Sequence, residues 1–344
     1  MKIFEEIHIR LTQEKPFVCY AKPNENTWNL LLQNNNEIIQ FSGQSGFVLL
    51  PFHEGIKAVI PFAESSFTTG TIETNKVTSD TIPNLKPQGK AAFEKLVADG
   101  IAAINTNSFD KVVLSRKMII TEQIAIVETF KNVLCAYPSA FRYLFFHPKI
   151  GLWMGATPEQ LVKINQDQFE TVALAGTQLF VENTTWATKE KEEQQFVTDY
   201  IVSNLEQNVA NLKVSEPQTV QAGKLAHIKS IITGSLTTTF TAIDLVNTLH
   251  PTPAVCGFPK EKARDFILAN ENYDRKYYAG FLGEYNKDKQ TDLFVNLRCL
   301  EIDNDVVTIY VGCGITKDSN PEKEYIETEN KSMTMRNVLV KSKK

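Results

Sequence analysis

The chain has 344 residues, 42% apolar and 22% charged, enough to bury a sizeable core in one large domain or two ordinary ones. The net charge of -4 and the pI near 5.9 argue against a polyanion partner such as nucleic acid. No apolar run approaches the ~18–20 residues of a membrane span, and the mixed start "MKIFEEIHIRL" is unlike a signal peptide. Five scattered cysteines without a C-x-x-C favour a reducing cytoplasm over a disulfide framework or a zinc site.

The first half of the chain reads as runs of strands interrupted by short helices. Residues 1–75 contain short β-like runs, and the polar residues 76–88 read as a connection. The elements predicted next are a helix at 89–106, a strand at 110–120, a helix at 127–136 and strands at 141–147, 151–157 and 170–177.

The second half continues this pattern, with predicted helices at 188–205, 242–249 and 259–269 and strands at 229–240, 278–286, 291–301 and 305–313. A last helix is predicted to begin at Pro321 behind an Asn320 cap. Strands that arrive in runs favour an α+β fold with large antiparallel or mixed sheets over a βαβ repeat. No dinucleotide-binding or P-loop motif is present.

The helix at 188–205 combines an apolar face with inward-pointing acids. Its predicted buried face consists of Phe196, Val197, Tyr200, Ile201 and Leu205. Glu193 and Glu190 lie one and two turns earlier on the same side. A carboxylate is expensive to bury unless it is paired or bound to a metal, so these two residues are candidate ligands.

The last helix repeats this arrangement, with Glu324, Glu327 and Lys331 on a face that Met335 and Val338 continue. Two such helices facing each other can hold one Mg²⁺, which takes one or two protein carboxylates and leaves other positions to water or an anionic ligand. The alternative is two surface helices with ordinary charge pairs.

Two charged residues near strands are candidate proton carriers. Lys111 begins a predicted strand, where a lysine is usually an edge or solvent-facing residue but a neutral amine can act as a base. Glu159 in "ATPEQL" reads either as an acid in the first turn of a helix or as a catalytic acid.

Three further features point to anion binding or to ordinary structure. "LAGT" (174–177) and "GCGIT" (312–316) read as glycine-bearing turns after strands, whose backbone N–H groups can cradle a carboxylate. Arg298 is predicted in the middle of a strand, where a semi-buried guanidinium needs an anion, either a ligand or an internal acid. His227 reads more readily as a structural residue than as a catalytic one.

Nine stretches occur in an order that resembles the chorismate-utilising enzymes, from about residue 90 to the C-terminus. They are "KVVLSR", "GATPEQLV", "LAGT", "KEKEEQ", "LHPTPAVCGFP", "YDRKYYAGFLG", "VNLRCL", "GCGIT" and "EKEYIETENK". "KVVLSR" and "HPTPAVCGFP" are most similar to the water-adding isochorismate synthase branch. This resemblance implies water addition at C2 of chorismate with loss of the C4 hydroxyl.

The resemblance also implies roles for particular residues. Lys111 matches the general base that activates water, and Glu159 matches the general acid at the departing hydroxyl. Glu193 and Glu327 match ligands of an Mg²⁺ cofactor that holds the ring carboxylate, with Glu190 and Glu324 as water-mediated or supporting partners. The grip on the enolpyruvyl carboxylate is assigned to Arg298, Tyr278, Gly314 and Ile315, and other pocket positions to Gly176, Thr177, His227, Thr252 and Lys331.

The resemblance further implies one α+β domain of two packed sheets with helices outside and the site in a cleft between the sheets. We divide it into an N-terminal β-rich part, 1–85, and a chorismate-binding core, 86–344. The expected partner is the small molecule chorismate, without nucleic acid or membrane, and the expected state is a monomer or weak dimer.

The sequence departs from the family pattern at a few positions. Gln194 replaces a histidine, "ATPE" replaces "ASPE", and Val255 replaces a leucine, which leaves side reactions in the pocket open. Salicylate synthase, the amine-adding anthranilate and aminodeoxychorismate synthases, and a non-catalytic Mg²⁺-dependent dicarboxylate binder stay as alternatives. Both menaquinone and siderophore synthesis are open as destinations of the product.

Overall fold

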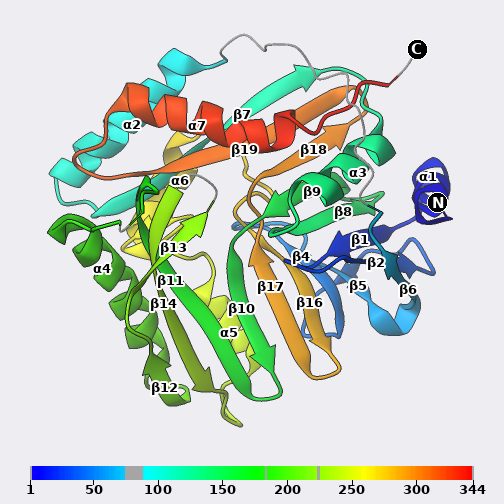
Figure 1. Cartoon of the computed structure of the whole chain (residues 1–344), viewed down its shortest axis with the longest axis horizontal. Coiled ribbons are helices and arrows are strands. Elements are labelled where there is room, and N and C mark those ends of the chain that lie inside the picture. Colours follow the sequence, from blue (N-terminus) through cyan, green and yellow to red (C-terminus); the bar gives the residue numbers. More distant parts are fainter. Residues whose placement is uncertain (1, 74–87, 183, 223–224, 343–344) are drawn as a thin grey trace.

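A computed structural model describes residues 2–73, 88–182, 184–222 and 225–342 (Figure 1). Within these residues the chain forms one α+β domain built on two large antiparallel sheets, which confirms the predicted fold class. None of the helices described is long and apolar enough to cross a membrane. The predicted connection at 76–88 lies outside the described residues, except for Gln88.

The first sheet has nine described strands. They include the first strand of the chain and the strand that begins with Lys111, the candidate base. Their order is β15 (Gly257–Phe258), β7 (Lys111–Thr121), β19 (Val306–Ile315), β18 (Cys299–Asp303), β9 (Gly151–Thr157), β8 (Phe141–His147), β1 (Phe17–Ala21), β2 (Thr27–Gln33) and β6 (Ser65–Thr71).

Much of the second sheet occupies the lower part of Figure 1. The order of its described strands is β12 (Ala210–Val214), β14 (Leu225–Ser235), β11 (Gln168–Leu179), β10 (Gln160–Asn165), β17 (Gln290–Val295), β16 (Phe281–Lys287), β4 (Gly46–Leu50), β5 (Ala58–Pro61) and β3 (Ile39–Gln40), and β13 (Gln218–Ala222) pairs with β14.

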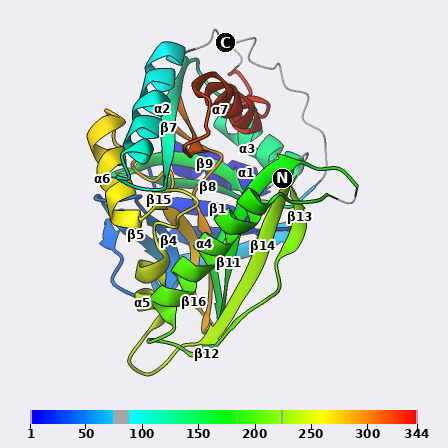
Figure 2. The ribbon, with the colours of Figure 1, turned by 90° about the vertical axis from the view of Figure 1, so that its left-hand side faces the viewer.

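Helices cover the outside of the sheets, and most begin and end within two residues of where the periodicity predicts. They are α1 (Lys2–Thr12), α2 (Lys90–Asn105), α3 (Ile126–Ala136), α4 (Thr188–Leu205), α5 (Ala242–Leu249), α6 (Lys260–Asn270), α7 (Pro321–Arg336) and the 3-10 helix η1 (Phe62–Glu64). Asn320 caps α7 as predicted, because its side chain accepts a hydrogen bond from the Lys323 N–H at 3.1 Å. Figure 2 shows α4 running beside β11 and β14, and α7 lying beside α2.

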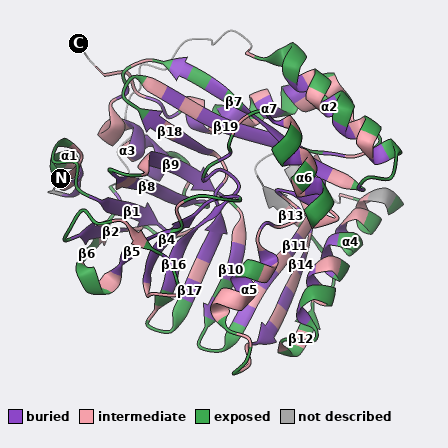
Figure 3. Ribbon diagram, turned by 180° about the vertical axis from the view of Figure 1, so that it is seen from behind, coloured by how far each residue is buried: buried purple, intermediate pink, exposed green. Residues whose placement is uncertain are grey.

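Two hydrophobic cores hold these layers together. The larger core joins residues of both sheets with α2, α4, α5 and α6, and the smaller one lies under α1 and α3 against the other face of the first sheet. In α4, Val197, Ile201 and Leu205 are buried against the larger core as predicted. Phe196, predicted on the same face, is 61% exposed, because a helical step of one residue turns its side chain away from the sheet. Figure 3 shows this contrast between the buried strands and the exposed outer faces of α2 and α4.

The N-terminal strands belong to both sheets. Strand β1 pairs with β8 in the first sheet, and β4 pairs with β16 in the second. Residues far apart in the sequence are therefore neighbours in both sheets.

Two of the segments in which the chain changes from one sheet to the other lie side by side, and we call them the first and the second passage. The first passage runs from β9 through Pro158 and Glu159 into β10, and the second runs from β17 through Arg298 into β18. The two passages are hydrogen-bonded to each other, since the Thr157 hydroxyl donates to the Val295 carbonyl at 2.5 Å and the Ala156 N–H donates to the Arg298 carbonyl at 3.1 Å.

These passages correct several predictions. The strand predicted at 291–301 is two strands in different sheets, and Arg298 lies between them in the left-handed region, with φ +49°, rather than in mid-strand. Glu159 leads into strand β10 and does not begin a helix. "LAGT" and "GCGIT" lie mainly inside β11 and β19 rather than in turns. A pattern of alternating apolar residues shows that a strand is present but not which sheet receives it.

We expect Gly155→Ala to destabilise the protein, because a Cβ there would lie 2.8 Å from Tyr143 Cε1 and 3.1 Å from the Arg298 carbonyl oxygen. The expected loss in the free energy of unfolding is about 1–3 kcal/mol, measured by chemical denaturation. Gly100→Ala serves as the control, because its Cβ would meet only the ends of flexible side chains. Equal stabilities of the two variants would contradict this account of the passages.

Candidate active site

The register of β7 on β19 places Lys111 beside the end of β19. Val113 pairs with Gly314 and Val112 pairs with Ile315, so the Lys111 side chain lies over Gly314. A Cβ on Gly314 would be 3.1 Å from Lys111 Cε, and the glycine therefore leaves room for the lysine stem. Gly314 and Ile315 thus contribute backbone next to the candidate base.

Lys111 forms an ion pair across the gap between a strand and a helix. Its Nζ donates to Glu193 Oε1 at 2.8 Å, and the two side chains are 17% and 30% exposed. The interpretation of Lys111 as an edge or solvent-facing lysine is therefore wrong, because the amine is directed at the acid of α4. Glu193 faces inward as its helical spacing predicts.

A second lysine–glutamate pair lies on α7. Lys331 Nζ contacts Glu327 Oε1 at 2.7 Å and also donates to the Gly312 carbonyl at 3.0 Å. Glu327 is the more exposed partner, with 46% of its side chain accessible. The carbonyl of Gly312 fixes the ammonium of Lys331 on the same strand end that carries Gly314.

Glu159 lies within the electrostatic reach of both lysines. Its main chain is held on both sides, because its N–H meets the Thr157 hydroxyl at 3.3 Å and its carbonyl accepts from the Val295 N–H at 2.9 Å. Burial raises the pKa of the Glu159 carboxyl to about 7, although the ammonium groups of Lys331 and Lys111 lower it. The site thus holds an acid whose proton is available near neutral pH.

Arg298 lies close enough to Tyr278 and Glu327 to interact with both electrostatically. Arg298 donates to the Thr334 hydroxyl at 2.9 Å and to the Lys331 carbonyl at 3.3 Å, so its hydrogen bonds go to α7 rather than to an internal acid. Burial lowers the pKa of Arg298, while the neighbouring Tyr278 and Glu327 raise it. Tyr278 is 4% exposed and stacks on Tyr310 with ring centroids 5.6 Å apart.

His227 and Gly176 form the wall on the second sheet. His227 Nδ1 lies 3.0 Å from the Gly176 carbonyl oxygen, which makes the imidazole a neighbour of β11. Burial lowers the pKa of His227, and Lys331, Glu327 and Arg298 are close enough to influence it. His227 of the second sheet thus lies within electrostatic reach of Lys331 and Glu327 on α7.

Two predicted site residues are not tied to this group. The side chain of Thr177 lies outside the described residues. Thr252 is in the turn between α5 and β15, and its hydroxyl is buried without a hydrogen-bond partner among the described residues. An unpaired buried hydroxyl of this kind is free to bind a ligand.

Four carboxylates on α4 and α7 have the chemistry of a hard-cation site. One oxygen of Glu190, Oε2, is buried and has no hydrogen-bond partner among the described residues. Burial raises the pKa of Glu324, and the charge of Glu327 raises it further. Among the described residues no three acids, histidines or cysteines lie close enough together to hold a metal ion.

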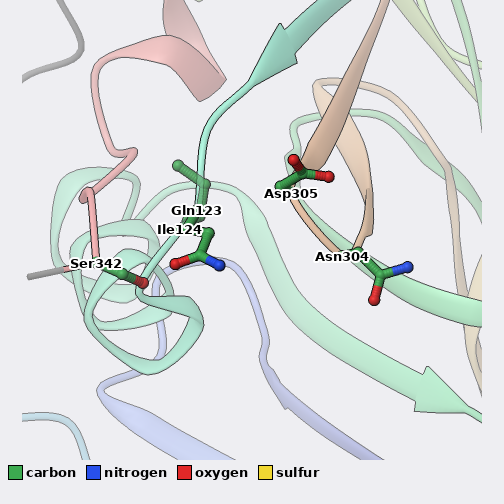
Figure 4. Close-up of a pocket in the computed structure, with 5 residues that line it drawn as sticks. All are labelled: Gln123, Ile124, Asn304, Asp305 and Ser342. Atoms are coloured by element: carbon green, nitrogen blue, oxygen red, sulfur yellow. The ribbon is translucent and has the colours of Figure 1, made fainter. Parts of the chain in front are cut away.

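Two surface cavities lie away from these residues. One cavity of ≈ 330 Å³ is lined by Gln123, Ile124, Asn304, Asp305 and Ser342 (Figure 4). Another, of ≈ 550 Å³, lies at the far ends of β10 and β17. None of the predicted site residues lines either cavity.

Sequence reasoning missed a buried ion pair behind β7. Glu271 and Arg275 are each 2% exposed, and Glu271 also accepts from the Ser115 N–H at 2.7 Å. Arg275 donates to the carbonyls of Val113 and Val255, and so ties β7 to the turn that carries Thr252. The acid–base pair with i,i+4 spacing at the end of α6 was the available sequence signal.

A family model described as "Chorismate binding enzyme" matches residues 56–340. The chain belongs to this family of chorismate-binding enzymes. The match begins upstream of residue 90, where the motifs of the sequence resemblance begin.

Within the family, the chain is similar to isochorismate synthases. It is 30% identical over 263 residues to isochorismate synthase EntC of Escherichia coli K12, which covers 73% of this chain and 67% of that protein. Anthranilate synthase component 1 of Saccharolobus solfataricus is 27% identical over 73% of this chain and 62% of its own length. The structure of MenF, the menaquinone-specific isochorismate synthase from Escherichia coli, has the same fold, with a TM-score of 0.80 at 21% identity over 95% of this chain and 89% of that one.

The raised pKa of Glu159 predicts a dependence of stability on pH. Its pKa rises from 4.5 to about 7 on folding, so the folded state favours the protonated acid and loses stability as the pH rises from 4.5 through 7. Glu159→Gln cannot ionise, and at pH 8 we expect it to exceed the unsubstituted protein in stability by about 1–3 kcal/mol.

Chemical denaturation at pH 4 and at pH 8 measures this difference, which is expected to vanish at the lower pH. Glu54→Gln, in which the replaced side chain is 91% exposed, serves as the control and should show no such dependence. The stability of Glu159→Gln is compared with that of the unsubstituted protein at each pH. If this difference is less favourable to the variant at pH 8 than at pH 4, Glu159 is not buried as described.

Proposed function

We propose that this protein is an isochorismate synthase, which converts chorismate to isochorismate by adding water to one ring carbon while a hydroxyl leaves another. The observation that carries the proposal is Glu159, a carboxyl whose pKa is raised to about 7 by burial and which lies within electrostatic reach of Lys331 and Lys111. The similarity to isochorismate synthases supports the same reaction.

Glu159 fits the role of the general acid. Hydroxide is a poor leaving group and must be protonated as its bond to carbon breaks, and an acid with a pKa near the working pH does this best. Burial keeps a proton on Glu159 at a pH where an ordinary glutamate has lost it. Removing such an acid typically costs about 10²–10⁴-fold in rate.

Lys111 fits the role of the general base. A lysine must be neutral to accept a proton from water, and the Nζ atom of Lys111 lies 2.8 Å from Glu193 Oε1. For Lys111 to act as the base, its ammonium would first give its proton to solvent, and a cation held by Glu193 would take the place of Lys111 in the ion pair. Lys111 and Glu159 come from different segments, which allows them to act on different parts of one ring.

Arg298, Tyr278 and Lys331 fit the binding of a dianionic substrate. The guanidinium of Arg298 retains donors beyond its bonds to Thr334 and Lys331, and the phenol of Tyr278 lies next to it. Together with Lys331 they supply positive charge and hydrogen bonds to offset the desolvation of carboxylates.

Mg²⁺ is the cofactor that we propose for this site, with Glu193 and Glu327 as ligands and Glu190 and Glu324 as supporting carboxylates. When bound, the ion would neutralise these acids and orient the ring carboxylate of the substrate. The partnerless Oε2 of Glu190 supports a cation at this position.

Product identification tests the reaction directly. We expect the protein with chorismate and Mg²⁺ to release isochorismate, identified by chromatography against a standard. Salicylate with pyruvate would instead indicate salicylate synthase, and anthranilate formed with added ammonia would indicate an amine-adding enzyme. Binding of chorismate without any product would indicate a non-catalytic binder.

We expect Lys111→Ala and Glu159→Gln to lose about 10²–10⁴-fold in kcat, because each removes one proton-transfer group. Steady-state kinetics, with circular dichroism as the check of folding, provides the measurement. For the unsubstituted enzyme kcat/KM should fall as the pH rises through about 7, since Glu159 must be protonated to act. Either variant with unchanged turnover would lose its assigned role.

We expect Glu193→Gln and Glu327→Gln each to weaken Mg²⁺ binding at least about tenfold. Loss of a residue that only supports a metal ligand already lowers metal affinity by about tenfold or more, and loss of a ligand itself should lower it at least as much. Isothermal titration calorimetry with Mg²⁺, in the presence of chorismate and in a Glu159→Gln background, measures the affinity without turnover. Glu322→Gln is the matched control on α7, since its side chain is 65% exposed and pairs with Lys90. Equal affinity in all three variants would remove α4 and α7 as the metal site.

A further inference from the structure

Asn296 begins the second passage between the sheets, directly after β17 and two residues before Arg298. It is fully buried, at 0% exposure, in the segment between β17 and β18. A buried amide is costly unless its donors and acceptors are satisfied, so the partners of this side chain indicate what it is for.

The side chain of Asn296 joins a strand of the first sheet to the loop that carries Tyr278. Its Oδ1 accepts a hydrogen bond from the Tyr143 hydroxyl of β8 at 2.7 Å, and its Nδ2 donates to the Tyr277 carbonyl at 2.9 Å. The Tyr277 carbonyl belongs to the peptide unit that precedes Tyr278. The amide therefore spans the gap between β8 and the backbone of a candidate binding residue.

The main chain of Asn296 makes two further bonds to the same loop. The Ala279 N–H donates to the Asn296 carbonyl at 2.9 Å, and the Asn296 N–H donates to the Gly280 carbonyl at 2.8 Å. Three hydrogen bonds from one residue thus hold residues 277–280 against the passage.

Both segments held by Asn296 contain a residue in the left-handed region. Ala279 has φ +60° and Arg298 has φ +49°, and neither is a glycine. A non-glycine residue stays in this region only where its surroundings over-determine it, and such residues cluster at functional sites. Ala279 follows Tyr278 directly, so the two strained positions adjoin or coincide with the two residues assigned to the substrate's carboxylate.

Room for this arrangement depends on Gly155 of β9. A Cβ there would lie 2.8 Å from Tyr143 Cε1, 3.0 Å from Cys299 Cβ and 3.1 Å from the Arg298 carbonyl oxygen. The ring that donates to Asn296 and the backbone of Arg298 are thus packed on the same glycine.

We propose that Asn296 is a positioning residue, whose buried amide holds the backbone behind Tyr278 and Arg298 so that both side chains are set for a substrate carboxylate before it binds. The inference rests on the proposed function, because that function assigns Tyr278 and Arg298 to the carboxylate. Asn296 itself does not touch the substrate. Its loss raises the cost of binding, since the two side chains must then be ordered on arrival.

Asn296→Asp and Tyr143→Phe test the proposal with little change of shape. The aspartate cannot donate to the Tyr277 carbonyl when ionised, and the phenylalanine leaves Oδ1 of Asn296 without its donor. We expect the KM for chorismate to rise about tenfold in the first and about threefold in the second, with kcat within about threefold of the unsubstituted enzyme.

The matched control is Tyr277→Phe, which also removes one hydroxyl from this loop. That hydroxyl donates to the Ile56 carbonyl at 2.9 Å and does not reach Asn296, so its KM should stay unchanged. Kd for chorismate, measured by calorimetry with Mg²⁺ in a Glu159→Gln background, should follow KM. Thermal unfolding checks that each variant is folded at the assay temperature, and Tyr143→Phe decides the matter if Asn296→Asp does not fold.

Unchanged Kd in both variants would overturn the inference, and so would a loss of kcat at constant KM or a loss of activity that merely tracks the folded fraction. The proposed function is tested separately by turnover of the unsubstituted protein. If that protein binds chorismate without converting it, the reaction is wrong and the Kd comparison still decides the role of Asn296. If it neither binds nor converts chorismate, both proposals fail.

Discussion

The hydrogen bonds between the two passages of the chain are the constraint on which the rest of the site depends. Thr157 and Glu159 bond to Val295 from one passage to the other, and Ala156 bonds to Arg298. These contacts fix where β9 gives way to β10 and where β17 gives way to β18. Because the strands on either side pair over many residues, a shift at the passages would have to move both sheets, and the acid and the guanidinium stay in one relative position.

Charge balance is the second organising feature of the site. Lys111 pairs with Glu193 of α4, and Lys331 pairs with Glu327 of its own helix, α7. Both lysines also lower the pKa of Glu159. The amines thereby offset the charge of Glu193 on α4 and of Glu327 on α7. Glu159 is the exception, because it forms no direct ion pair with any described residue and burial is the largest influence on its pKa. The same desolvation that makes it costly to the fold makes it a proton donor near neutral pH.

Local patterns in the sequence were sufficient for the type of fold and for the helices from α2 onward, but α1 was missed because residues 1–75 were read as short β-like runs. Apolar spacing gave the bounds of α4 and turned Glu193 inward, and Asn320 with Pro321 gave the start of α7. The pairing of Lys111 with Glu193 was not predictable in this way, since it depends on the register of β7 and on where α4 packs. Arg298 was misplaced for a similar reason, because "VNLRCL" has the composition of one strand while its backbone turns between two sheets. The exposure of Phe196 shows that neighbouring apolar residues on a helix need not share a face.

The division of the first seventy residues between both sheets limits how this protein can be dissected. A fragment trimmed to the family-matched segment 56–340 would lack β1, β2 and β4, and would leave β8 and β16 with bare hydrogen-bonding edges. Such edges recruit strands from neighbouring molecules, so the fragment would aggregate. The N-terminal strands are therefore not a separate module that could be exchanged between relatives. Substitutions in them affect the strands β8 and β16, with which they share backbone hydrogen bonds.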